Sequence, residues 1–439
     1  MSIKISAKHF VKSHSHIVFK DVDGIIRAVN GLTLSVEAEG TDFKTVLQAI
    51  IADNRHILVK AGVYLVNSTI DLSGKKGLII EGESYQWGHQ LTDKGTVLRL
   101  NANVDMFKID NTALGAPQNN PVGVIIKNLQ LDGNVRGGLT SGRGIYAKNV
   151  GSLRIEHCHI HSFAGNGVHL EFCMDVRIEG NSIGGCDTSG SHTATAKTNG
   201  TWIPNNYGVY VDSGYVIWIR GNGIWHNVKS GIYVTNTLGV LENLYIDRNN
   251  IVWNDEHGIF IERKSAANKL WFIHIADNTI DEEWNHGLYA KDSIGTSNWD
   301  LNLFVLSNQF VGSNRAGAAV DTNFGIAIEG YSTTYRACGV ELVGNIATDP
   351  FGRNQGSLKL TNVDGIRVTS CGFNRLPVIT GTVSHTLSQI AAPAPYGGLP
   401  YYTTLPTTPP ANSVVLYYDG TSYYIAAYVA GVWKKVAIT

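Results

Sequence analysis

Four side chains near the middle of the sequence could together move protons: His169, Glu171, Tyr210 and Asp212. Each stands two or four residues after a glycine that opens the same short motif. Two carboxyl groups held close together drive their pKa values apart, so that one can donate a proton while the other stays ionised. A phenol or an imidazole beside them could give or take a proton instead. We therefore predict that these four residues form a catalytic group.

The motif, glycine-apolar-x-apolar, recurs along the chain and extends this group into a longer surface. Its first and third positions after glycine are apolar, so the second and fourth positions should face solvent on a strand of period two. The resulting column of rings could bind the faces of sugars. The alternative is a column that only stabilises the sheet. The predicted substrate-binding residues are Tyr146, Lys148, Tyr233, Phe260, Glu262, Tyr289 and Lys291, with Lys229 and His257 from the preceding turns.

A second repeat indicates how this surface is held together. Segments of the form apolar-x-apolar-x-x-Asn end at Asn181, Asn222, Asn249, Asn278 and Asn308. Uninterrupted repeats are about 23–29 residues long, enough for three short strands that must stack on their neighbours to bury their apolar sides. The asparagines should form a ladder in which each amide satisfies backbone groups of the next coil. The pattern predicts an all-β protein, a right-handed parallel β-helix from about Leu78 to about Thr382.

Two kinds of turn should flank the exposed face. An insertion of about 18 residues, near 185–204, is expected to leave the stack beside the predicted catalytic group, because long loops on a regular scaffold often carry function. Asp255, Glu256, His257 and His286 lie in turns just before motif glycines and form the second choice for a catalytic cluster. His257 and His286 should stack in adjacent coils.

The two ends of the chain depart from the repeats. Residues 42–53 have the apolar spacing of a helix that could cover the open end of the coil stack, with Thr41 or Asp42 as its N-cap. We divide the chain into an N-terminal segment with this cap (1–77), the β-helix (78–386), a Pro-, Ala- and Thr-rich linker (387–412) and a small β module (413–439). The module is a hairpin around Asp419–Gly420 plus a third strand. It is too short to fold alone, so it should pack on the stack or on its own copies.

The amino-acid composition disfavours several classes of function. The formal net charge is -1 with 16% charged residues, which disfavours a nucleic-acid partner. No apolar run is long enough for a membrane span or a signal-peptide core, so we expect a soluble protein without membrane insertion. The five cysteines are odd in number and scattered, which favours buried, reduced thiols over disulfides.

The run His157–His161 looks like a metal site, but strand alternation separates its side chains. Cys158 takes the buried ladder position of the repeat, whereas His159 and His161 should project outward on one side. A tetrahedral site needs four convergent ligands. We therefore predict no metal site there, and no cofactor.

The N-terminal half of the chain resembles a known superfamily. The predicted helix 42–53, followed by Val59–Val66, Thr69–Leu72 and Leu78–Glu83, is similar to the entry segment of the pectate-lyase-like β-helix superfamily. The resemblance covers most of residues 40–380 and implies a polysaccharide substrate bound on the motif strands, with a calcium ion in some members. The C-terminal Tyr-Asp-Gly-x-x-Tyr-Tyr pattern is similar to short modules of phage tail proteins. It implies a homotrimer on analogy with tailspikes, and a site of action outside the cell or on a virion.

The resemblance leaves the reaction open among lyase, epimerase and glycoside hydrolase, because the superfamily includes all three as well as tailspikes. The Asp-Pro-His of mannuronan C-5 epimerases is absent after Gly208, and so are the paired aspartates of polygalacturonases. In a hydrolase, two carboxyl groups would flank the glycosidic bond. In a lyase or epimerase, a base would remove the proton next to a uronate carboxylate while cations neutralise that carboxylate. The alternative to all three is a protein that only binds glycan or builds a particle.

Overall fold

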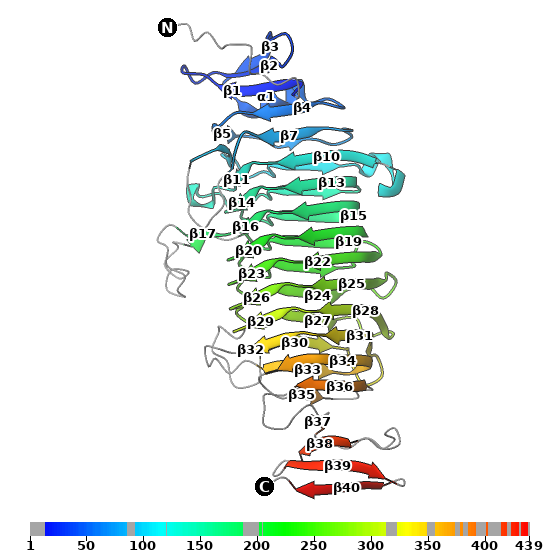
Figure 1. The fold of residues 1–439 in the computed structure, drawn as a ribbon. Helices are drawn as coiled ribbons and strands as arrows, with labels where there is room; N and C mark the ends of the chain where they lie inside the picture. The colour runs from blue at the N-terminus through cyan, green and yellow to red at the C-terminus, as the bar shows by residue number, and fades with distance from the viewer. Residues whose placement is uncertain are drawn as a thin grey trace.

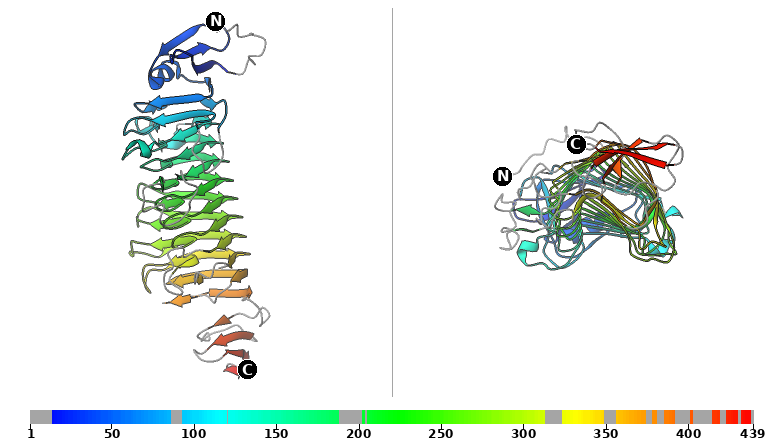
Figure 2. Two further views of the ribbon diagram at one scale, coloured as in Figure 1. Left: turned by 90° about the vertical axis from the view of Figure 1, so that its left-hand side faces the viewer. Right: turned by 90° about the horizontal axis from the view of Figure 1, so that it is seen from below.

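The protein is an elongated stack of coils (Figure 1). The computed structural model describes residues 14–85, 93–119, 121–187, 202–203, 205–312, 323–348, 356–373, 378–380, 385–391, 401–402, 414–418, 423–429 and 432–437. Each coil contributes three strands, and the same strand of successive coils pairs in parallel. Seen along the stack, the coils superpose closely (Figure 2). The predicted parallel β-helix is confirmed.

Three columns of strands run along the stack. The motif sheet carries the glycine-apolar-x-apolar strands: β6 (Ile70–Asp71), β9 (Phe107–Asp110), β12 (Ile145–Lys148), β21 (Ile232–Thr235), β24 (Ile259–Arg263), β27 (Leu288–Asp292), β30 (Phe324–Glu329), β33 (Gly356–Thr361) and β35 (Val378–Thr380). The long-strand sheet carries β4 (His56–Val59), β7 (Ile79–Gly82), β10 (Pro121–Lys127), β13 (Gly151–Glu156), β22 (Leu241–Asp247), β25 (Leu270–Ala276), β28 (Trp299–Leu306), β31 (Ala337–Val343), β34 (Val363–Phe373) and β36 (His385–Ala391). Two bent strands, β15 (Val168–Glu179) and β19 (Val209–Arg220), belong to both sheets.

The short-strand sheet completes each coil. Its members are β5 (Gly62–Val66), β8 (Thr96–Leu100), β11 (Gln130–Asp132), β14 (His159–His161), β16 (Ser182–Gly184), β20 (Gly223–Trp225), β23 (Asn250–Val252), β26 (Thr279–Asp281), β29 (Gln309–Val311) and β32 (Ile346–Thr348). Short 3-10 turns lie at Thr112–Leu114, Pro117–Asn119 and Val135–Gly137. Apolar side chains from all three sheets point inward and form one continuous buried core.

The N-terminal end is closed as the sequence predicts. Helix α1 (Phe43–Ile50) is capped by Asp42, whose carboxylate accepts the backbone N–H of Thr45 at 2.8 Å. The helix buries Phe43, Val46, Leu47 and Ile50, and Ile51 follows them into the core. Strands β1 (His16–Lys20), β2 (Ile26–Asn30) and β3 (Val36–Gly40) pair antiparallel beside it. Parallel pairing already begins with β1 on β4 and continues with β4 on β7, inside the segment that the sequence assigned to the cap.

The asparagine ladder is confirmed bond by bond. The Nδ2 groups of Asn181, Asn222, Asn249, Asn278 and Asn308 each donate to the Oδ1 of the next asparagine, at 2.9–3.1 Å. The same Oδ1 also accepts the backbone N–H of the preceding ladder residue, and a second Nδ2 hydrogen reaches a backbone carbonyl of the coil before. These asparagines are buried. The amides therefore satisfy backbone groups that the bend would otherwise leave unpaired inside the protein.

Cys158 occupies the buried ladder position as predicted, with its backbone N–H donating to Asn181 Oδ1 at 2.8 Å. Burial raises the pKa of its thiol to about 12. His159 and His161, predicted to project outward, are both buried, 1% and 0% exposed. Alternation does place them opposite Ile160, but the outer side of the short-strand sheet is covered from β11 to β20.

Two further regions complete the described chain. Strands β17 (Cys186–Asp187) and β18 (Trp202–Ile203) pair antiparallel at the base of the predicted insertion, whose residues 188–201 lie outside the described residues. At the C-terminus, β37 (Tyr401–Tyr402), β38 (Val414–Tyr418), β39 (Tyr423–Val429) and β40 (Val432–Ala437) form a separate sheet. The antiparallel pairing of β38 with β39 and of β39 with β40 confirms the hairpin and the third strand, although the tip at 419–422 is not among the described residues.

The ladder makes a direct stability prediction. Asn249→Ala would leave the backbone N–H and Nδ2 of Asn222 and the carbonyl of Ile219 without their partner, each at a cost of about 1–3 kcal/mol. We expect a clear fall in the melting temperature, measured by circular dichroism. The neighbouring Asn250 is exposed and provides a matched control, so Asn250→Ala should melt close to the parent. Equal melting temperatures for the two variants would contradict a stabilising role of the ladder.

Candidate functional site

The predicted column of rings exists on the motif sheet. Strand register places Tyr146, His169, Tyr210, Tyr233, Phe260 and Tyr289 side by side in successive coils. Neighbouring ring centroids are 5.5, 4.3, 5.2, 5.2 and 5.1 Å apart along this series. The column stops at Ala327, which is buried. We call these six rings the motif ladder.

The ladder is less exposed than predicted. Tyr146 and Tyr233 are only 9% and 3% exposed, and the other four rings are half-buried. The cover comes from the residue just before the motif glycine. The Arg143 guanidinium lies 3.6 Å from the ring centroid of Tyr146, and the Tyr207 ring stacks on Tyr233 at 4.9 Å. The sequence carried this signal, since the same position recurs in every motif, but only the histidines there were singled out.

His257 and His286 belong to this covering layer. Their rings stack at 5.2 Å, which confirms the predicted contact between adjacent coils. Each Nδ1 accepts a backbone N–H of the next coil, His257 from His286 and His286 from Phe324. Burial lowers the pKa of both imidazoles, that of His286 to about 4. His257, predicted to bind substrate, is a neutral imidazole in this covering layer and is only 8% exposed.

The fourth motif position forms a repeated three-residue unit. Tyr146 donates its hydroxyl to Glu171 at 3.0 Å, and the Lys148 ammonium lies 3.2 Å from the same carboxylate. Two further units have the same composition: Tyr233, Glu262 and Lys264, and Tyr289, Glu329 and Lys359. In each unit the tyrosine comes from the coil before the glutamate. We call these the Tyr–Glu–Lys units.

The units keep their carboxylates ionised. The His169 imidazole, 3.2 Å away, lowers the pKa of Glu171 to about 2, and Lys148 and Tyr146 add to this effect against burial. Burial raises the pKa of Glu262, but hydrogen bonds from Tyr233, Ser293 and Lys264 outweigh it, so that the net shift is downward. Of the two carboxyl groups in the predicted catalytic group, Glu171 is therefore one that stays ionised. Burial and the adjoining carboxylates raise the pKa of the tyrosines, which remain donors.

Tyr210 belongs to none of the Tyr–Glu–Lys units. The next coil carries Thr235 where the other units carry glutamate, and the Tyr210 hydroxyl donates to no described residue. Its ring is held between His169 at 4.3 Å and Tyr233 at 5.2 Å, with Tyr207 at 5.7 Å. Burial, together with nearby carboxylates, raises its pKa to about 12. Tyr210 thus presents a protonated hydroxyl that can donate a hydrogen bond to a ligand.

Asp212 does not face solvent as predicted. It is 4% exposed, and its Oδ1 accepts the Ser213 hydroxyl at 2.9 Å and the Leu238 backbone N–H at 3.0 Å. Gly239 N–H donates to the same serine, so the carboxylate fixes the turn that follows β21. Glu171 and Asp212 do lie opposite each other in neighbouring strands, as the spacing indicated.

The pKa of Glu256 is raised, whereas the pKa values of the glutamates in the Tyr–Glu–Lys units are lowered. It lies half-buried in the turn before Gly258, beside Lys229. Burial is the main cause of a raised pKa, and Asp255 adds to it while Lys229 opposes it. Both Glu256 and Glu262 act on the phenol of Tyr207, whose ring also lies 5.2 Å from the Lys229 ammonium. A carboxyl with a raised pKa and one with a lowered pKa therefore both act on the same phenol.

A hollow of about 540 Å³ lies at the far end of the motif ladder. It is lined by Lys291, Glu329, Tyr331 and Lys359, among others. Lys291 lies in register between Glu262 and Glu329, and forms no ion pair with any described residue. Together with Lys359 it gives this hollow two ammonium groups.

A second ladder, which the sequence reading missed, runs along the outer face of the long-strand sheet. Trp218, Tyr245, His274 and Phe304 stack nearly parallel, with centroids 5.8, 5.0 and 4.8 Å apart. These residues stand between the two apolar positions of the asparagine repeat, so the sequence of that repeat already indicates a column of rings. Beside this column, two positions further along the strands, Arg220 and Asp247 form an ion pair at 2.9 Å.

Among the described His, Cys, Asp and Glu side chains, no group matches the oxygen ligands of calcium. Calcium takes six to eight oxygen ligands. Within the described ranges, the one group of three or more close ligating side chains holds two imidazoles and a single carboxylate. No helix among the described residues is long and apolar enough to cross a membrane.

Comparison with known proteins agrees with the architecture. No curated protein matches the sequence. Among solved structures, the A-module of the mannuronan C-5 epimerase AlgE6 of Azotobacter vinelandii shares 12% identity with a TM-score of 0.55, covering 81% of this chain and 96% of the epimerase module. The N-terminal fragment of gene product 12 of bacteriophage phi29 shares 14% identity with a TM-score of 0.59, covering 91% and 71%. At these identities the likeness concerns the fold alone.

The sequence itself matches the family described as the right-handed beta helix region over residues 48–304. This match begins within α1 and ends within β28, and so includes most of both aromatic ladders. Since it spans more than half of the 439-residue chain, the protein belongs to the right-handed β-helix family.

Proposed function

We propose that the protein is a carbohydrate-active enzyme that cleaves a polysaccharide bound along the motif ladder. The reaction centre comprises Tyr207, Tyr210, Lys229, Glu256 and Glu262. The observation that carries this proposal is the pair of carboxyl groups around Tyr207, one with a raised and one with a lowered pKa. Pairs whose environments separate their pKa values in this way are typical of acid–base catalysis.

Glu256 is the proton donor in this proposal. Its raised pKa keeps the carboxyl protonated closer to neutral pH, which a general acid requires when it protonates the leaving oxygen of a glycosidic bond. Glu262 stays ionised because Tyr233, Ser293 and Lys264 hydrogen-bond to it. An ionised carboxylate can activate a water or stabilise the positive charge that develops on the sugar ring.

Tyr210 and Lys229 position the substrate. The Tyr210 hydroxyl has no described partner, so a sugar hydroxyl or carboxylate can accept its hydrogen bond. Elimination would need a base, and a phenol with a pKa of about 12 is a poor one at neutral pH. Tyr210 is therefore assigned as a hydrogen-bond donor, and the proposal is the hydrolysis that two carboxyl groups of unlike pKa would support. Of the four residues predicted from sequence, His169 and Glu171 become the neighbouring subsite and Asp212 a positioning residue.

The other residues predicted to bind substrate extend the site. Tyr146, Lys148, Tyr233, Phe260 and Tyr289 line the same face, and Lys291 with Lys359 lies at the hollow beyond Tyr289. Ammonium groups there favour an acidic polysaccharide, because a uronate carboxylate could replace the missing partner of Lys291. The fold likeness to a mannuronan-acting enzyme makes mannuronan a reasonable member of the substrate panel.

A non-catalytic, glycan-binding or structural virion protein is the second candidate. One observation favours it: the glutamates of the Tyr–Glu–Lys units already have protein partners, as expected of a ladder that stabilises the sheet. The phi29 gene product has a similar fold. The C-terminal sheet, with Val432 56% exposed, suits self-association, and we propose a homotrimer, which light scattering would show as three times the chain mass.

The deciding experiment is incubation with a panel of polysaccharides, following reducing ends and the ultraviolet absorbance of unsaturated products together. The proposal predicts reducing ends alone. Unsaturated products would indicate a lyase. Binding without any product, after a search for epimerised residues by NMR, would favour the second candidate.

Glu256→Gln tests the acid directly. On a substrate that the parent cleaves, we expect turnover to fall by about 10²–10⁴-fold, because the amide cannot donate the proton. Glu242→Gln is the matched control, since Glu242 is a half-buried glutamate on the long-strand sheet. Near-parental turnover of Glu256→Gln would rule out this assignment.

The parent should also show a bell-shaped pH–rate profile. The rate should fall at high pH as Glu256 loses its proton above a raised pKa. It should fall at low pH as Glu262 gains one below a lowered pKa. In Glu256→Gln the high-pH limb should disappear from the residual rate, whereas a general loss of stability would not remove it.

A further inference from the structure

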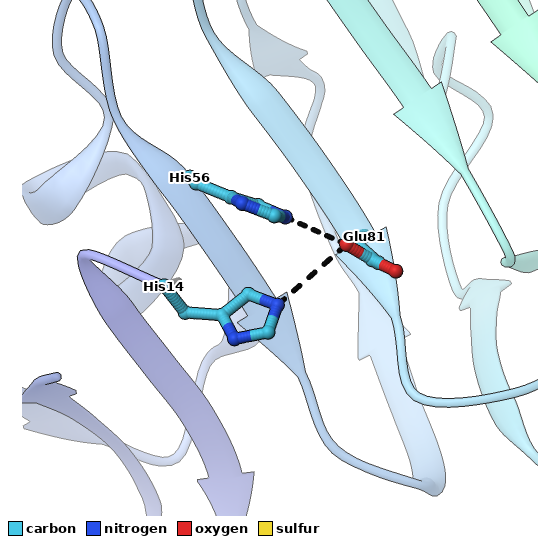
Figure 3. Close-up of side chains that lie close together, drawn as sticks. All are labelled: His14, His56 and Glu81. Atoms are coloured by element: carbon cyan, nitrogen blue, oxygen red, sulfur yellow. Dashed lines mark hydrogen bonds and ion pairs between the residues drawn. The ribbon is translucent and has the colours of Figure 1, made fainter. Parts of the chain in front are cut away.

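A cluster of ligating side chains lies outside the motif sheet, at the N-terminal end of the long-strand sheet. His14 stands just before β1, His56 opens β4 and Glu81 lies in β7 (Figure 3). The Nε2 atoms of His14 and His56 lie 3.6 and 2.6 Å from the same oxygen, Oε2 of Glu81. The two imidazole centroids are 4.3 Å apart. Three segments far apart in sequence thus converge on one point.

The spacing of these atoms suits a small cation. The three ligand atoms all lie within 4.8 Å of one another. Around zinc, with bonds of about 2.0–2.2 Å to nitrogen and oxygen, tetrahedral ligand atoms are roughly 3.3 Å apart. Small side-chain rotations would bring the present distances to that value. The side chains are 21%, 22% and 17% exposed, so a fourth position is open to water.

The surroundings prepare these groups for a cation. Asn128 donates to Oε1 of Glu81 at 3.1 Å and fixes the carboxylate, as outer-shell partners of metal ligands commonly do. The Lys127 ammonium lies 3.1 Å from Oε2 and places a positive charge beside the ligand atoms.

We propose that His14, His56 and Glu81 bind a divalent transition-metal ion, with zinc the best match to two imidazoles and one carboxylate. The ion takes the place of Lys127 on Glu81. It links the residue before β1 to strands β4 and β7, and so reinforces the existing parallel pairing of β1 with β4. This site is independent of the motif ladder and of the proposed reaction.

The test uses the full chain without a histidine tag. Cobalt is titrated in as a spectroscopic substitute for zinc, and zinc binding is measured by calorimetry. We expect one equivalent of cobalt with the visible bands of a tetrahedral site, displaced by zinc, and a higher melting temperature with zinc. His14→Gln and His56→Gln should each weaken binding by about 100-fold or more, beyond the loss typical of outer-shell changes.

Two further variants make the result specific. His274→Gln removes a half-buried imidazole from β25 and should leave the affinity unchanged. Lys127→Met should tighten binding, because it removes the competing ammonium, and this gain cannot come from a misfolded variant. Absence of a tetrahedral cobalt spectrum, or equal affinity in the parent and both ligand variants, would overturn the proposal.

Discussion

The stacking of one coil on the next at fixed register is the constraint on which the rest of the structure depends. Parallel hydrogen bonds hold each strand opposite its counterpart, and the buried amides from Asn181 to Asn345 hold the bends in the same line. The surroundings of a residue therefore depend less on its own sequence neighbours than on the residues one coil before and one coil after it. Columns of like side chains follow directly, apolar inside and aromatic outside.

This constraint also shapes the chemistry of the motif sheet. Carboxylates repeated at one position would repel each other across successive coils. Glu171 adjoins Asp212, but Glu262 lies two coils from Asp212 and two coils from Glu329. Glu171 and Glu262 each receive a tyrosine hydroxyl and an ammonium group. Where the repetition breaks, at Thr235, the hydroxyl of Tyr210 is left for a ligand. The proposed reaction centre thus lies at an irregularity in a regular lattice of contacts.

The sequence was sufficient for the architecture because the repeat is local. Two periods, one of apolar alternation and one of asparagine, predicted the strands, the ladder, the capping helix and the stacking of His257 on His286. The sequence did not predict the solvent exposure of side chains, because alternation tells which side of a strand a residue occupies but not what covers that side. This is why His159, His161 and Asp212 were expected in solvent. Contacts between distant segments that lie outside the repeats, such as that of His14 with Glu81, have no local signal in the sequence.

The two outer ladders offer a direct comparison: both present stacked rings, and carboxyl groups with a raised and a lowered pKa lie at the motif ladder. The most direct measurement is a crystal structure of the catalytically impaired protein with a bound oligosaccharide. The account predicts sugar rings on the motif ladder, with a hydrogen bond from the Tyr210 hydroxyl and a glycosidic oxygen beside Glu256. An oligosaccharide bound only over Trp218, Tyr245 and His274 would contradict it.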